Sequence, residues 1–216
     1  MGRRSDYSIR NETMKIYLLR HGESVDDIED SYGGIADYPL TEAGRQTADD
    51  LARKLVGAGI ELLYSSPYKR AIETASIVSS ALRCEVKTID DLRERNSYGV
   101  LSAINKAKAK EIFAHVLRDL KQKPGDYYSE ELVCGAEPRA EFDARVKKAF
   151  EQVLKESVQY KVIGIVTHGN VTRSIYRNIL AVSGKIELDL LATTIINYAP
   201  ASMEIVAKEG ITVKQG

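Results

Sequence analysis

The sequence predicts an α/β protein with three layers, in which helices cover both faces of a largely parallel central sheet. Short apolar runs alternate with longer amphipathic segments, which is typical of strand–helix–strand units. Two apolar runs at opposite ends of the chain, 16–19 and 162–167, each lead into a His-Gly pair. With 216 residues, 44% of them hydrophobic, the chain is long enough for one domain with a sizeable core.

The first strand is followed by a loop at 24–39 and then by an amphipathic helix. Thr41 is the expected N-cap of this helix, and glycines at 57 and 59 are expected to end it. Apolar residues recur three and four positions apart and predict one buried face: Ala48, Leu51, Ala52, Leu55 and Val56. A second strand is expected at 60–64.

The next helix is predicted to open at Ser65-Ser66-Pro67, with Pro67 at the first helical position and Arg70 in the first turn. A helix start presents free N–H groups, which suit an anion, although an arginine taken alone is more often a solvated surface residue. A third strand at 86–89 leads into a dense polar loop at 90–99, and a helix is expected at 106–121.

The last third of the chain is predicted to hold a long helix that starts at Pro138, the strand at 162–167 and a helix at 171–182. Three strands are then expected at 193–198, 203–207 and 211–213, with Pro200 and Gly210 at the turns between them.

We interpret residues 1–13 as a disordered leader, because they are polar and lack the apolar stretch of a secretory signal. Residues 14–216 are expected to form one domain, with an inserted helical lobe at about 95–136.

Charge and cysteine content exclude several classes of partner. The 31 basic and 31 acidic residues give a formal net charge of zero, so we expect no nucleic acid and no membrane surface as a partner. Cys84 and Cys134 stand apart and outside any CxxC motif, which favours free thiols in a reducing, cytoplasmic setting. The oligomeric state stays open, with a homodimer as one option.

Candidate site residues follow the two His-Gly strands. Arg20 and His21 end the first strand, and His168 ends the later one. If the two strands are parallel neighbours, both imidazoles face one pocket at the carboxyl edge of the sheet. A single histidine at a strand end is more often an ordinary loop-boundary residue, so the interpretation depends on the whole set.

Four motifs in this order resemble those of the histidine phosphatase superfamily, which includes phosphatases and cofactor-dependent phosphoglycerate mutases. They are Leu-Leu-Arg-His-Gly-Glu at 18–23, Tyr-Ser-Ser-Pro-Tyr-Lys-Arg-Ala-Ile-Glu-Thr-Ala at 64–75, Leu-Arg-Glu-Arg at 92–95 and Val-Thr-His-Gly-Asn at 166–170. The resemblance covers residues 14–200 and implies a phosphoglycerate mutase-like fold.

The resemblance also implies the roles of five side chains. His21 resembles the nucleophile that becomes phosphohistidine, and Arg20 and Arg70 resemble the guanidinium pair that holds the phosphoryl oxygens. His168 resembles the second histidine of the phosphate pocket, and Glu94 the acid that protonates the leaving oxygen.

General chemistry agrees with these roles. Planar guanidinium groups match the equatorial oxygens of a phosphoryl group in transfer. A neutral imidazole is a usable nucleophile near pH 7 without a metal. Since no metal-ligand spacing is present, we expect a metal-free site without a cofactor for hydrolysis.

Two departures from the mutase pattern bear on function. Asp27 stands where mutases carry Asn, and a carboxylate there would repel a phosphate unless it points away or is protonated. Residues 107–136 also lack the paired arginines of mutases. Further candidates for substrate contact stand in or beside the motifs: Ser24, Asp27, Arg95 and Asn170.

Three functions therefore remain. The sequence favours a phosphomonoesterase that acts on a small phosphorylated metabolite through phosphohistidine. The alternative is a phosphoglycerate mutase that uses 2,3-bisphosphoglycerate as cofactor, which the mutase-like stretches 94–99 and 104–106 favour. A non-catalytic module that binds a phosphate ligand is the third.

Overall fold

A single mixed sheet forms the centre of the computed structural model, which describes residues 13–115, 117–118 and 133–215. The strand order is β3-β2-β4-β1-β5-β6. The first four strands are mutually parallel, and β5 and β6 form an antiparallel hairpin at one edge. The strands are β1 (Met14–Arg20), β2 (Leu62–Ser65), β3 (Glu85–Thr88), β4 (Val162–Thr167), β5 (Lys185–Ala199) and β6 (Ser202–Lys214).

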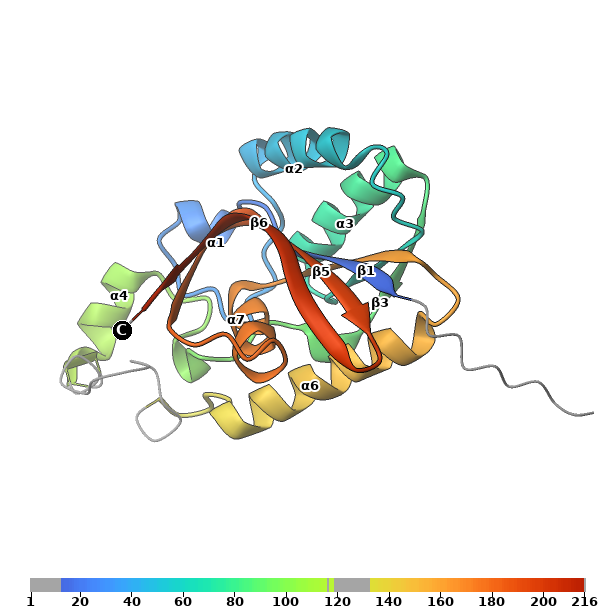
Figure 1. Ribbon diagram of the computed structural model, residues 1–216. Coiled ribbons are helices and arrows are strands. Elements are labelled where there is room, and N and C mark those ends of the chain that lie inside the picture. Colours follow the sequence, from blue (N-terminus) through green and yellow to red (C-terminus); the bar gives the residue numbers. More distant parts are fainter. Residues whose placement is uncertain (1–12, 116, 119–132, 216) are drawn as a thin grey trace, which may run out of the picture.

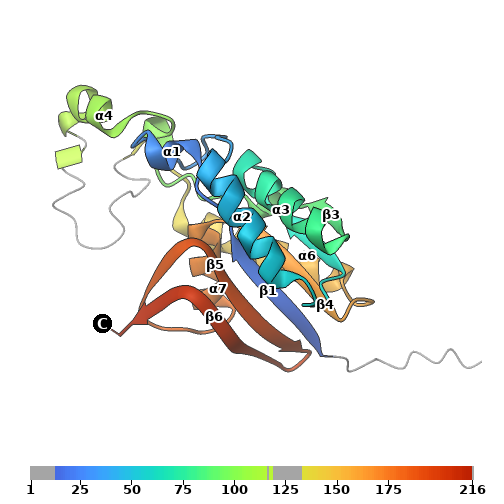
Figure 2. The ribbon, with the colours of Figure 1, turned by 90° about the horizontal axis from the view of Figure 1, so that it is seen from above.

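Helices cover both faces of this sheet, as the sequence predicts (Figures 1 and 2). The pair α2 (Glu42–Leu55) and α3 (Lys69–Leu82) packs on one face. The pair α6 (Arg139–Glu156) and α7 (Gly169–Asn178) packs on the other. Side chains of β1 alternate between the two cores, because successive residues of a strand point to opposite faces.

Shorter elements surround the carboxyl edge of the parallel strands. They are α1 (Val25–Ile28), α4 (Lys106–Ile112) and two 3-10 turns, η1 (Asp90–Leu92) and η2 (Gly99–Leu101). A small third core connects the loop after β1 with the region of the predicted lobe; its buried members are Tyr32, Leu101, Ala109, Val133 and Ala136.

The pairing of β1 with β4 positions the site. The two strands are parallel neighbours, and Arg20 lies opposite Thr167. The next residues of each strand, His21 and His168, therefore leave the sheet side by side.

The predicted first helix is confirmed at both ends. The hydroxyl of Thr41 accepts a hydrogen bond from the backbone N–H of Gly44 at 2.9 Å, which satisfies a donor at the helix start. After α2, Gly57 adopts a left-handed conformation with φ of +86°.

Three helix boundaries differ from the prediction. Helix α3 begins at Lys69 rather than Pro67, because Tyr68 is extended and serves as the N-cap. Helix α4 ends at Ile112, because Phe113 leaves the helical conformation; residues 114, 115, 117 and 118 are helical again, and the remainder of the predicted range 106–121 lies outside the described residues. Helix α7 starts directly after His168 and stops at Asn178, shorter at its end than the predicted range 171–182.

The tail forms two long strands instead of the three predicted short ones. Pro200 does lie in the turn between them. Gly210, expected at a second turn, lies inside β6 with φ of +67°. It faces an irregular stretch of β5 between Leu188 and Thr193, where the pairing with β6 shifts register. The shift in pairing makes a bulge at Gly210. Glycine suits this position, because a Cβ there would lie 3.3–3.4 Å from atoms of Asp189 and Ala192.

The predicted leader falls almost wholly on residues 1–12, and much of the predicted lobe falls on 119–132; both ranges lie outside the described residues. Across the described part of the chain, no helix is long and apolar enough to cross a membrane.

Candidate active site

His21 is held in one tautomer directly after β1. Its Nδ1 lies 2.7 Å from the carbonyl oxygen of Gly22, and the side chain is buried. Because a carbonyl only accepts hydrogen bonds, Nδ1 must carry the proton. The lone pair of the imidazole therefore lies on Nε2, the nitrogen that the hydrogen bond to Gly22 leaves unoccupied.

His168 lies next to His21 at the end of β4. The ring centroids are 5.0 Å apart, with an angle of 59° between the ring planes. The Nε2 of His168 lies 2.7 Å from the hydroxyl of Ser66, and its buried Nδ1 has no hydrogen-bond partner among the described residues. The structure therefore confirms the prediction that the two imidazoles lie next to each other.

Both histidines are neutral near pH 7. Burial lowers the pKa of His21 well below the usual 6.5, and the positive charges of Arg70 and Arg20 lower it further. The pKa of His168 is lowered in the same way, by burial first and then by Arg70 and the neighbouring ring. A neutral ring is the form that can attack phosphorus, because a protonated imidazole has no lone pair.

Two guanidinium groups flank the imidazoles. Arg20 donates from Nη1 to the carbonyl of Leu188 at 2.8 Å, while its buried Nε has no partner among the described residues. Arg70, only 2% exposed, donates to the carbonyls of Ala36 and Gly34 at 2.7 and 3.2 Å. The loop after β1 thus fixes the orientation of Arg70, which the chain supplies from the first turn of α3 as predicted.

Glu94 belongs to the loop after η1, and its carboxylate contacts the first turn of α7. Its Oε2 accepts from the backbone N–H of Asn170 at 3.2 Å, and its Oε1 accepts from the backbone N–H of Arg95 at 2.8 Å. These two bonds hold the carboxylate on the rim of the same hollow that His21 faces.

The hollow has a volume of about 230 Å³ and a strongly polar lining. Side chains of both charges line it: Arg20, Arg70, Arg95 and Lys106 are cationic, and Asp26, Asp27 and Glu94 are anionic. Its remaining lining residues are His21, Ser31, Gly33, Gly34, Tyr98 and Asn170. Volume and lining suit a small, charged molecule better than an apolar one.

The sequence-based candidates for substrate contact divide into two groups. Arg95, Asp27 and Asn170 line the hollow. The fully buried Ser24 does not: its hydroxyl donates to Oδ1 of Asp26 at 2.7 Å and lies 3.1 Å from Oδ2 of Asp27. His168 lies behind His21 rather than on the open surface of the hollow, with no exposed area.

Asp27 is engaged in the start of α1. Its Oδ2 accepts from the backbone N–H of Ser24, the N-cap residue, at 2.9 Å, which is one of the two contacts of a capping box. The carboxylate therefore has local partners, and Arg20 is close enough for its charge to interact with it.

Sequence reasoning missed several residues of the site, among them Tyr98, Lys106 and Ser66. Tyr98 and Lys106 line the hollow from the polar loop and from α4, and Ser66 supports His168. Tyr98 and Lys106 lie in the mutase-like stretches, which were the available signal. Ser66 stands in the second motif, but its contact with His168 depends on the β2–β4 pairing and has no local signature.

Nothing in the described ranges forms a group of three or more His, Cys, Asp or Glu side chains suited to hold a metal ion.

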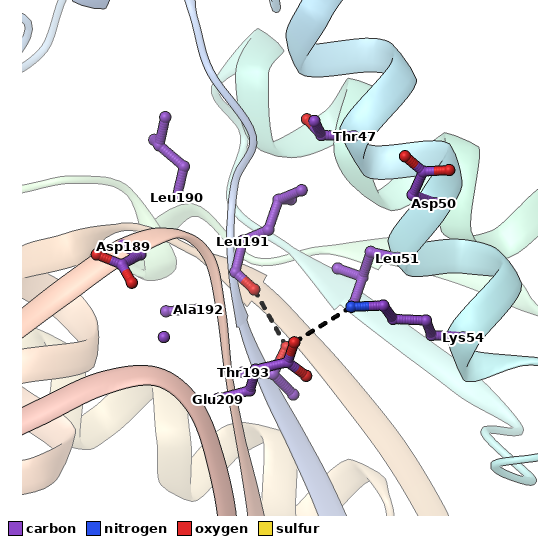
Figure 3. Close-up of a pocket in the computed structure, with 11 residues that line it drawn as sticks. Thr47, Asp50, Leu51, Lys54, Asp189, Leu190, Leu191, Ala192, Thr193 and Glu209 are labelled. Atoms are coloured by element: carbon purple, nitrogen blue, oxygen red, sulfur yellow. Dashed lines mark hydrogen bonds and ion pairs between the residues drawn. The ribbon is translucent and has the colours of Figure 1, made fainter.

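The irregular segment 189–192 of β5 contacts the backbone of His21. The backbone N–H of Leu191 donates to the carbonyl of His21 at 3.3 Å, and Leu191 itself has φ of +56°. The same segment lines a second hollow of about 430 Å³, closed on its other sides by α2 and β6 (Figure 3). There Lys54 and Glu209 form an ion pair at 3.2 Å.

Fold and geometry together define an α/β protein with a charged hollow beside two buried histidines at the carboxyl edge of its sheet. Residues 16–209 match the histidine phosphatase superfamily (branch 1). The chain belongs to this superfamily, whose enzymes are of the phosphatase and phosphoglycerate mutase type, and the resemblance seen in the sequence is confirmed.

Relatives of both enzyme types match most of the chain. The chain is 30% identical to the 2,3-bisphosphoglycerate-dependent phosphoglycerate mutase of Corynebacterium kroppenstedtii over 94% of its own length and 90% of that protein. It is 31% identical to the metal-independent phosphoserine phosphatase of Arabidopsis thaliana over 82% of its own length and 74% of that protein. The solved phosphoglycerate mutase of Bacillus anthracis has the same fold, with a TM-score of 0.76 at 21% identity over 91% of this chain and 93% of that chain.

Proposed function

We propose that this protein is a phosphomonoesterase that removes the phosphoryl group from a small phosphorylated metabolite by way of phosphohistidine at His21. The observation that carries the proposal is the fixed tautomer of His21, which leaves a neutral Nε2 beside two guanidinium groups. Family membership supports the reaction type.

Arg20 and Arg70, which line the hollow, are the proposed holders of the phosphoryl oxygens, and the buried His168 beside His21 is proposed to complete the phosphate pocket. Arg20 Nε and His168 Nδ1 are buried nitrogens whose hydrogen-bonding capacity no described residue uses. Buried polar atoms are normally satisfied, and Arg20 lines the hollow, so a ligand oxygen is the natural partner for its Nε. Such donors stabilise charge on the equatorial oxygens as the phosphoryl group moves.

In the first half-reaction, Nε2 of His21 forms a bond to phosphorus as the ester P–O bond breaks. Glu94 gives its proton to the departing oxygen, so that an alcohol leaves instead of a strongly basic alkoxide. In the second half-reaction, the Glu94 carboxylate takes a proton from water as that water attacks the phosphohistidine. Inorganic phosphate is released, and His21 and Glu94 return to their starting forms.

Charges beyond the phosphoryl position suggest the class of substrate. Arg95 and Lys106 lie in the lining of the hollow together with Asp26 and Asp27. Both signs of charge within about 230 Å³ suit a phosphorylated small acid or amino acid better than a neutral sugar. The relative named as a phosphoserine phosphatase is consistent with such a substrate. A reducing, cytoplasmic location would fit the two free thiols.

Replacing His21 by Ala tests the nucleophile. We expect turnover of p-nitrophenyl phosphate to fall to background, and wild-type enzyme quenched in alkali to carry an acid-labile, base-stable phosphoryl group that the variant lacks. Full turnover by the variant would remove His21 from the nucleophile role. A wild type as inactive as the variant would instead leave the non-catalytic phosphate-binding module as the better description.

The second candidate is a phosphoglycerate mutase dependent on 2,3-bisphosphoglycerate. It is favoured by the mutase relative that covers almost the whole chain, and by Lys106, a cation within the hollow but outside the two phosphate-holding arginines. The two functions share the first half-reaction and differ in whether the site retains the product and excludes water.

An assay with 3-phosphoglycerate separates the two functions. We expect release of inorganic phosphate that does not depend on added 2,3-bisphosphoglycerate. Formation of 2-phosphoglycerate only when that cofactor is present would contradict the phosphatase proposal and establish the mutase.

A further inference from the structure

Glu94 lies on a stretch of chain without helix or strand, residues 93–98, between η1 and η2. Proton transfer requires the carboxyl group to lie within hydrogen-bond distance of the leaving oxygen, and an error of about 1 Å can cost about a hundredfold in rate. Regular secondary structure does not fix the backbone of this stretch, so its position must come from other contacts.

One buried arginine of α6 supplies these contacts. Arg145 donates from Nη1 to the carbonyls of Asp91 and Arg93, both at 2.9 Å, and from Nη2 to the carbonyl of Glu94 at 3.1 Å. Its Nε and Nη2 donate to the carboxylate of Glu137 at 2.6 and 2.8 Å. These five bonds equal the number of N–H donors that a guanidinium group has.

Glu137 holds the same stretch from its other side. Its carboxylate accepts from the backbone N–H of Asn96 at 3.2 Å, and its backbone N–H donates to the carbonyl of Asn96 at 2.7 Å. Its own carbonyl accepts from Nε and Nη2 of Arg95 at 3.1 and 3.0 Å. Residues 91–96 are thus connected to the start of α6 along their whole length.

The ion pair within this network is well shielded from water. The side chains of Arg145 and Glu137 are 10% and 16% exposed, in contrast to the exposed ion pairs of α2. Arg145 also lies over the ring of Phe142, with its guanidinium carbon 4.9 Å from the ring centroid. Shielding strengthens charge-assisted hydrogen bonds and makes a missing partner costly.

Arg145 does not reach the substrate hollow, whose lining excludes it. We propose that Arg145 is a positioning residue for the proton donor: it holds the backbone carbonyls of Asp91, Arg93 and Glu94 so that the carboxyl group meets the leaving oxygen. The inference rests on the proposed function, because it assigns Arg145 to one step of that reaction. Glu137 keeps the guanidinium group oriented.

A positioning role for Glu94 predicts a loss that depends on the leaving group. A p-nitrophenolate departs without a proton, whereas an alkoxide needs one. Lysine in place of Arg145 keeps the charge but offers three donors from a single point, and it cannot span three carbonyls and a carboxylate at once. The Arg145→Lys enzyme should therefore be impaired chiefly on alkyl esters.

The experiment compares kcat/KM for p-nitrophenyl phosphate, phenyl phosphate and ethyl phosphate in wild type, Arg145→Lys, Glu94→Gln and the double variant. We expect Arg145→Lys to lose about twofold on the nitrophenyl ester and about ten- to a hundredfold on the ethyl ester. The double variant should be no worse on ethyl phosphate than Glu94→Gln, because both changes act on one step.

Two further variants guard the interpretation. If Arg145→Lys does not fold, Glu137→Gln takes its place in the comparison. This variant keeps the shape of the network but removes the charge opposite Arg145, so its losses in kcat/KM should follow the same leaving-group trend and be smaller. Arg53→Lys, which changes an exposed arginine of α2 that pairs with Asp49 and Asp50, should leave all three rates unchanged.

Equal losses on all three esters, or losses that multiply in the double variant, would overturn the positioning role while leaving the proposed function intact. Wild-type enzyme with no His21-dependent turnover of any ester would instead overturn the proposed function, and the positioning role with it.

Discussion

The two buried histidines make the stability of this protein sensitive to pH in the range 5.5–7.5. His21 and His168 are 5% and 0% exposed, and burial together with Arg70 and Arg20 lowers the pKa of both well below 6.5. Below pH 6.5 the unfolded chain binds a proton on each ring, whereas the folded protein keeps both rings neutral. The unfolded state then holds more protons, so the free energy of unfolding decreases as the pH falls.

The size of this effect follows from the number of rings. Each histidine contributes at most about 1.4 kcal/mol per pH unit, and the loss runs from the unfolded pKa down to the lowered folded pKa. Two rings that both stay neutral should cost about 3 kcal/mol between pH 7.5 and 5.5. Urea unfolding at several pH values, followed by circular dichroism, measures the difference.

Carboxylates also titrate near the acid end of this range, so the informative quantity is a difference between variants. His21→Gln combined with His168→Gln should remove most of the slope. If the double variant kept the full slope, the assignment of the two rings as buried and neutral would be wrong.

Three other predictions address separate parts of the molecule. Glu94→Gln should slow hydrolysis of alkyl phosphates by about a hundredfold or more while largely sparing p-nitrophenyl phosphate; equal losses in steady-state assays would contradict its role as the acid. Gly44→Ala should destabilise the protein by about 1–3 kcal/mol in urea titration, because a Cβ there would lie 2.1 Å from the carbonyl oxygen of Glu23; unchanged stability would show that α2 can shift freely. EDTA should leave turnover unchanged, and a loss restored by added metal would contradict the metal-free site.

Much of the parallel core could be predicted from sequence because its signals are local. A buried strand is a continuous apolar run, and Thr41 stands where a helix start needs an acceptor. The meeting of His21 and His168 followed from one further assumption, that β1 and β4 are neighbours.

The errors arose where tertiary contacts decide the local conformation. Gly210 has the sequence signature of a turn, but the chain uses it for close approach to Asp189 within a hairpin. Pro67 could have begun a helix, yet Tyr68 stays extended and Lys69 donates its backbone N–H to Asp37 at 2.6 Å.

The support around the site was hidden for the same reason. Ser66 contacts His168, which stands 102 positions later in the sequence. Arg145 contacts Glu94, which stands 51 positions earlier. No periodicity or motif records such a separation, because it exists only after the sheet and α6 have assembled.

The side-by-side placement of β1 and β4 has a consequence for how activity arises during folding. Each strand brings one ring, and the chain between them contains most of the domain, so a fragment from either terminus holds only half of the site. Closing so distant a pair is slow compared with forming local helices. Enzyme activity should therefore return only with the last phase of refolding, and helical content alone would be a poor guide to how many molecules are functional.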